Sequence, residues 1–71
     1  MKWHCLNRGA WAGEDGWWVL KVRHWPFAPW DVYRNYMIGD ERRFERFAGG
    51  FWTRAGAQQW ATIEQLAEQR V

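Results

Sequence analysis

Three side chains carry the soft nitrogen and sulfur atoms that bind transition metals, namely His4, Cys5 and His24. A structural zinc site needs four such ligands at a recognisable spacing, and these three follow no spacing motif. We therefore expect no metal and no cofactor. Because the chain has one cysteine, an internal disulfide is excluded. Cys5 is expected to be a small buried hydrophobic residue.

The residues of the common hydrolytic and phosphate-binding motifs are also missing. The chain contains no serine, which excludes a serine nucleophile. Gly49-Gly50 lacks the Lys and Ser/Thr that a phosphate-binding loop requires. Most acidic residues stand in expected turns or beside arginines, where solvated ion pairs are the ordinary arrangement. We expect a protein that is not an enzyme.

Binding chemistry is better represented, in the strand expected over 17–25, where side chains alternate between two sides. One side is aromatic and cationic and comprises Trp17, Val19, Lys21, Arg23 and Trp25. The other side is mainly apolar and comprises Trp18, Leu20, Val22 and His24. Burying a Lys–Arg pair in so small a core would leave charges without partners. We therefore expect the first side to face outward and the second to carry a helix.

An exposed face with two large indoles is a candidate interaction surface. The principal candidates for partner binding are Trp17, Lys21, Arg23, Trp25 and Arg43. Secondary candidates are Phe27, Trp30, Arg34 and Arg46. Three alternatives stay open: the N-terminal segment can cover this face through Trp3 or Trp11, the loop 25–30 can plug the core, and the run 42–47 can be a solvated face.

The element that the other segments must support is a C-terminal helix, predicted over 54–70. Thr53 is a good N-cap, and Trp52 can pack on Ala57 as a hydrophobic staple. An apolar stripe at helical spacing comprises Ala57, Trp60, Ile63, Ala67 and Val71, with Leu66 at its edge. The polar side comprises Gln58, Thr62, Gln65 and Gln69.

Strands are predicted over 2–7, 17–25, 30–38 and 42–47, with a loop over 8–16. In the second long strand, alternation does not decide which side meets the helix, and a bulge near Arg34 would reconcile both sides. The fold class is α+β, a three- or four-stranded antiparallel sheet with one C-terminal helix packed on one face. Residues 1–71 form a single domain, with an N-terminal strand or arm and a loop (1–16), a sheet (17–53) and a helix (54–70).

The composition favours a binding protein. Eight Trp and an excess of Arg over Lys are typical of binding hot spots, whereas a net charge of +2 is a weak footprint for nucleic acid. Apolar runs are too short to span a membrane, and no signal peptide is recognised. A cytosolic location is the default expectation.

Two segments together resemble a known family. Gly16-Trp17-Trp18-Val19, followed by Gly50-Phe51-Trp52-Thr53-Arg54 with Ala57 and Trp60-Ala61, is similar to the arm-type DNA-binding domain of tyrosine-family phage and transposon integrases. The resemblance covers roughly 16–64. It implies a three-stranded sheet whose exposed face enters the major groove, with Lys21, Arg23 and Arg43 as contacts. Glu41 and Glu45 make the third strand less basic than is usual there, and we expect no catalytic integrase domain to follow.

Two functions are expected from different classes. The first is a small phage or mobile-element protein that docks on a host protein or protein–nucleic acid complex as an inhibitor, of the anti-CRISPR or host-takeover type. The alternative is a DNA-binding accessory protein like a free-standing integrase arm domain. Because acids are interleaved with arginines in the sequence, we favour the protein partner. A self-associating structural protein is a third possibility.

Overall fold

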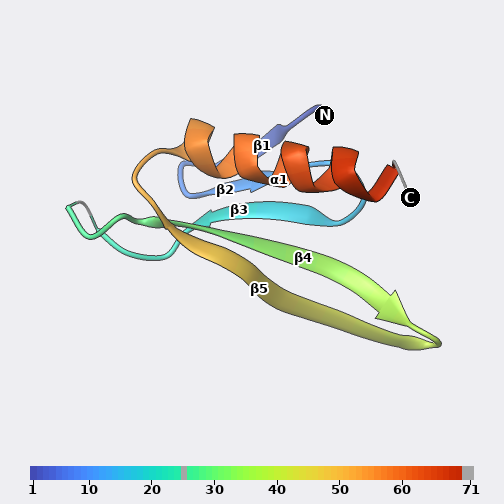
Figure 1. Cartoon of the computed structure of the whole chain (residues 1–71). Coiled ribbons are helices and arrows are strands. Elements are labelled where there is room, and N and C mark those ends of the chain that lie inside the picture. Colours follow the sequence, from blue (N-terminus) through green and yellow to red (C-terminus); the bar gives the residue numbers. More distant parts are fainter. Residues whose placement is uncertain (25, 70–71) are drawn as a thin grey trace.

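The computed structural model describes residues 1–24 and 26–69, and Figure 1 shows one helix lying across one face of a twisted sheet. The five strands are antiparallel and follow one another in the sheet in chain order. The elements are β1 (His4–Asn7), β2 (Ala10–Ala12), β3 (Trp17–Lys21), β4 (Trp30–Ile38), β5 (Glu41–Phe51) and α1 (Arg54–Gln69). The predicted α+β fold is confirmed, with five strands instead of three or four. The predicted roles of Trp25 and Val71 lie outside the described residues.

The N-terminal segment extends the sheet: the strand predicted over 2–7 is present as β1, whereas the segment expected to be a loop contains β2. Ala10–Ala12, expected in a loop, pairs with β3, so that Trp11 lies opposite Val19. Strand β1 is the outer edge of the sheet and its residues are exposed. The expectation that Cys5 is buried is therefore wrong, since it lies on this edge.

Strand β3 ends four residues earlier than predicted, at Lys21. The amide of Val22 donates to the carbonyl oxygen of Pro29 at 2.8 Å, which closes the loop between β3 and β4. Two prolines in this loop supply no backbone donors and cannot extend the ladder.

The core forms between α1 and the side of β3 that was expected to face outward. Trp17 is 1% exposed and Val19 is fully buried, together with Val32, Ala57 and Ala61. The predicted orientation of β3 is therefore wrong. Since the strand stops at Lys21, neither cation has to lie under the helix, and the charge-burial argument does not apply.

Helix α1 begins where predicted, but the residues that it buries against the sheet differ from the predicted apolar stripe. The amide of Gly56 donates to Thr53 Oγ1 at 3.0 Å, which confirms the N-cap. The buried helix residues are Ala57 and Ala61. Ile63 is 56% and Leu66 50% exposed, so their placement in the buried stripe is wrong. Small side chains let the helix approach the large rings of the sheet.

A polar residue of α1 belongs to the sheet-facing side. Gln65, predicted on the polar side, accepts a hydrogen bond from Trp17 Nε1 at 2.9 Å. The Trp17 ring also packs edge-on against Trp60, with 6.1 Å between ring centroids. A buried indole needs an acceptor for its N–H, and this need explains the inward position of Gln65.

Strand β5 carries two extra residues opposite β4. Val32 pairs with Ala48 whereas Tyr33 pairs with Arg46, which leaves Phe47 as an extra residue, and a second irregularity follows before Phe51. The bulge predicted near Arg34 thus lies close by, on the partner strand. Bulges bend and re-aim a strand, and here Phe47 packs edge-on against Trp17 at 5.5 Å.

Candidate functional site

Within residues 1–24 and 26–69, no helix or strand covers the side of the sheet opposite α1 in Figure 1, and we call this side the open face. Residues paired directly across an antiparallel ladder share a side, so the register assigns its members. On β3, β4 and β5 they are Trp18, Leu20, Asp31, Tyr33, Asn35, Met37, Arg42, Phe44 and Arg46. Trp3 and Trp11 pack against the core on the helix side. The alternative that the N-terminal segment covers the Trp17 side of β3 through these residues is therefore confirmed, and α1 covers that side as well.

Three rings at the centre of the open face form one aromatic cluster. Tyr33 and Phe44 are stacked, with centroids 5.2 Å apart and an interplanar angle of 11°. Trp18 meets Phe44 edge-on at 6.3 Å. Phe44 remains 52% exposed. The cluster is thus a preorganised apolar surface that fixes its own rotamers, which lowers the entropy cost of binding.

The two sides of the sheet separate the charges of β5. Glu41, Arg43 and Glu45 lie on the helix side, where Arg43 pairs with the two glutamates at 3.4 and 3.6 Å. Arg42 and Arg46 lie on the open face. Residues that alternate in sequence point to opposite sides of a strand. Glu41 and Glu45 alternate with arginines in the sequence, but they therefore lie on the opposite side of β5 from Arg42 and Arg46.

Glu45 also acts on the tyrosine beside it on the helix side. Its hydrogen bond with Tyr36 raises the pKa of that phenol above the ordinary value of 10.0, and burial and the negative charge of Glu45 act in the same direction. The nearby Arg43 guanidinium lowers it in part. The charge of Glu45 is thus engaged away from the open face.

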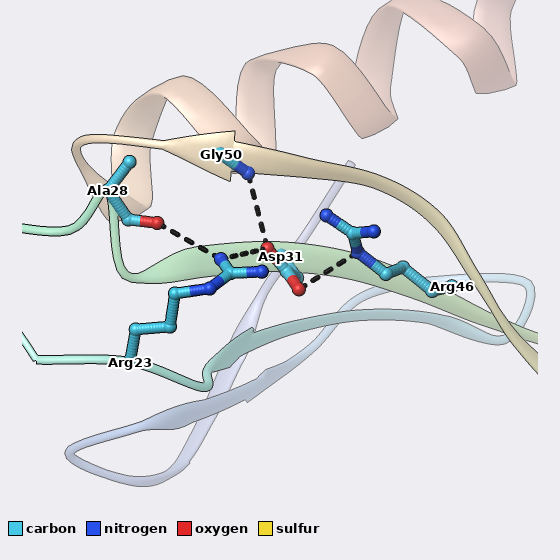
Figure 2. A network of polar contacts seen from close by, with 5 residues as sticks. All are labelled: Arg23, Ala28, Asp31, Arg46 and Gly50. Carbon is cyan, nitrogen blue, oxygen red and sulfur yellow. Dashed lines mark hydrogen bonds and ion pairs between the residues drawn. The ribbon is translucent and has the colours of Figure 1, made fainter.

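One acid does lie on the open face, and it is buried beneath two arginines (Figure 2). Asp31 is 2% exposed. Its Oδ1 accepts from Arg23 Nη1 at 3.1 Å and from the Gly50 amide at 3.2 Å, and its Oδ2 accepts from Arg46 Nε at 2.9 Å. We call Arg23, Asp31 and Arg46 the arginine pair site. Two cations around one anion leave it with one net positive charge.

The principal residues predicted for partner binding do not lie together in the structure. Trp17 is in the core, so its predicted place on the outer face is wrong. Lys21 is exposed at the end of β3 and shares the helix side by alternation. Arg23 reaches the open face through Asp31. Arg43 lies on the helix side, and Trp25 is outside the described residues.

The secondary candidates for partner binding also lie in different parts of the fold. Phe27 is 70% exposed in the loop between β3 and β4, and Trp30 packs against the core. Arg34 lies over the Trp17 ring at 4.6 Å and pairs with Glu68 at 2.7 Å, so it fastens α1 to the sheet. Arg46 is on the open face.

Sequence reasoning missed the aromatic cluster. Trp18 was assigned to the helix side, and Tyr33 and Phe44 were not candidates. The alternation Arg42, Phe44, Arg46 against Glu41, Arg43, Glu45 was the available signal, because it already separates an aromatic and basic side from a mixed one.

The open face presents guanidinium hydrogen-bond donors and aromatic ring surfaces, and such groups can bind a partner. Within residues 1–24 and 26–69, no group of three or more His, Cys, Asp and Glu side chains is placed to hold a metal ion. In the same part of the chain, no helix has the length and apolar character needed to cross a bilayer. No protein-family model matches the sequence, and no curated protein or solved structure is significantly similar to it.

Proposed function

We propose that this chain is a non-enzymatic binding protein that docks its open face on nucleic acid. The observation that carries the proposal is the separation of charge across the sheet. The open face has Arg23, Arg42 and Arg46 around the aromatic cluster, and its one strand acid is buried and paired. The glutamates of β5 lie on the other side.

This arrangement removes the reason for favouring a protein partner. That preference depended on acids interleaved with arginines in the sequence, and the alternation of β5 puts them on opposite sides. Arginine binds phosphate through paired N–H donors. The resemblance to integrase arm-type domains implies DNA binding through the sheet face away from the helix, although two of the three contacts that it implies, Lys21 and Arg43, lie on the helix side.

The salt dependence of binding follows from the number of cations. Two or three phosphate contacts give a slope of log K against log salt of about −2 to −3 on duplex DNA, since each contact contributes about −0.9. Affinity should then fall by about 10- to 40-fold between about 50 and 200 mM salt.

A protein partner is the second candidate function, with the chain acting as an inhibitor of a host machine in the manner of mobile-element proteins. Exposed apolar side chains near the β4–β5 hairpin favour it: Met37 and Ile38 are each 57% exposed and Phe44 is 52% exposed. Aromatic residues, Met and Arg are enriched at protein interfaces. Binding through these contacts would change little with salt.

The test is titration of a labelled random-sequence duplex at low and at physiological salt, beside a pull-down from host lysate. Arg42→Gln is compared with Arg43→Gln, which removes the same charge from the opposite side of the same strand. The proposal expects Arg42→Gln to weaken duplex binding and Arg43→Gln to leave it nearly unchanged. Equal losses would show that the open face has no special role.

A further inference from the structure

The arginine pair site has more hydrogen-bond donors than the protein uses. A guanidinium has five N–H donors. Arg46 bonds Asp31 through Nε, and Arg23 bonds Asp31 and the Ala28 carbonyl oxygen through Nη1. Within the described chain, the Nη groups of Arg46 and the Nε and Nη2 groups of Arg23 donate no hydrogen bond. The Arg46 and Arg23 side chains are 50% and 41% exposed, so a ligand can reach both guanidinium groups from solvent.

The backbone around the site is shaped to hold the guanidinium groups. At Gly49, a Cβ atom would collide with Arg46 Nη2 and Asp31 Oδ1, so only glycine leaves room for the arginine to lie against β5. Ala28 has a φ of 49°, which is uncommon for a residue other than glycine. Its carbonyl oxygen accepts from Arg23 at 3.3 Å. Both arginines are therefore positioned by the backbone as well as by Asp31.

We propose that the arginine pair site binds a phosphodiester group of nucleic acid, with Asp31 as the residue that positions both arginines. Planar guanidinium donors match phosphate oxygens and can bind them in pairs. The site's single net positive charge suits the single negative charge of a phosphodiester. Holding the arginines in place beforehand reduces the entropy lost on binding.

The position of the site beside the aromatic cluster fits this ligand. Arg46 lies directly opposite Tyr33, and Tyr33 lies directly opposite Trp18. Because neighbouring strands are about 4.8 Å apart, the backbones of Tyr33 and Trp18 lie about 5 to 10 Å from that of Arg46. A strand whose phosphate is held by the arginine pair site would thus pass over the cluster.

The inference rests on the proposed nucleic-acid binding, and the experiment separates the two. Arg46→Gln and Arg23→Gln are each compared with wild type and with Arg43→Gln in binding to the labelled duplex across a salt series. Each of the first two should weaken binding about tenfold or more, as expected for a charged hydrogen bond, and reduce the salt slope by about 0.9. Arg43→Gln should change neither.

A second measurement does not depend on the stability of the variants. Inorganic phosphate is titrated into the wild-type protein while the arginine side-chain N–H resonances are followed by NMR. The resonances of Arg23 and Arg46 should shift and saturate, and those of Arg43 should stay in place. Equal shifts at Arg43, or no shift at the pair, would overturn the site.

The outcomes have distinct meanings. If wild type binds the duplex while Arg46→Gln and Arg23→Gln retain its affinity and salt slope, nucleic-acid binding stands and the phosphate site is refuted. If wild type binds no duplex at low salt, both the proposed function and the site are refuted.

Discussion

Replacing Trp17 by Ala should leave the domain largely unfolded. The side chain is 1% exposed and packs at nearly a right angle against the rings of Phe47 and Trp60. Truncating a buried Trp to Ala costs about 3–5 kcal/mol. The change also removes the donor to Gln65 and the ring beneath Arg34. A domain of this size rarely has more than about 3–5 kcal/mol of stability, so the loss is comparable to the whole.

Urea unfolding followed by far-ultraviolet circular dichroism measures this loss mainly through the backbone and not through the fluorescence of eight indoles. Trp17→Phe keeps a ring in the core but loses the hydrogen bond to Gln65, and should cost less than the Ala variant. Trp52→Ala is the matched control, because Trp52 is 61% exposed and surface changes usually stay within about 0.5 kcal/mol. If Trp17→Ala unfolds within about 1 kcal/mol of wild type, the assignment of the core is refuted.

Three further changes test neighbouring parts of the structure. Trp60→Ala should cost about 3 kcal/mol, near the lower end for a core Trp because the ring is partly exposed, and a thermal midpoint within a few degrees of wild type would contradict this. Gly49→Ala should cost about 1–3 kcal/mol, as overpacking does, because its Cβ displaces Arg46; an unchanged melting curve would show that the arginine lies elsewhere. Glu45→Gln should lower the pKa of Tyr36 toward 10.0, since Glu45 is the main cause of its rise. A pH titration followed by tyrosinate absorbance measures this pKa, and the same titration curve as in wild type would contradict the role of Glu45. The raised pKa favours the protonated phenol in the folded state, so its stabilisation is present below the unfolded-state pKa and lost as pH rises through the folded-state pKa.

Local signals in the sequence predicted much of the fold. Thr53 before a run of good helix formers specified where α1 begins, because a hydroxyl at that position satisfies a free amide of the first turn. The strand over 30–38 coincides with β4. These features depend on residues that are close in sequence, so the pattern contains them.

The facing of β3 could not be predicted in the same way. Alternation separates Trp17 and Val19 from Trp18 and Leu20, but both pairs are large and apolar, and hydrophobicity does not rank them. The choice depends on where the strand ends and on the acceptor that Gln65 supplies from a distant helix. Such long-range contacts leave no local pattern.

The prediction of the site residues was wrong for the same reason. Once β3 was assigned the wrong orientation, Trp17 was placed on the outer face and Trp18 under the helix. The pairing of Asp31 with two arginines also depends on the bulges of β5, which bring the Gly50 amide and Arg46 to one carboxylate. Arg23 and Arg46 were separate candidates, and their shared contact with Asp31 was not predicted.

Mapping the bound surface by NMR tests the central claim most directly. A short random-sequence duplex is titrated into isotope-labelled protein at low salt, and the backbone amide shifts are assigned. Docking through the open face predicts the largest changes at Trp18, Tyr33, Phe44 and Arg46. Changes centred instead on the exposed side of α1, at Ile63 and Leu66, with the open face unaffected, would contradict it.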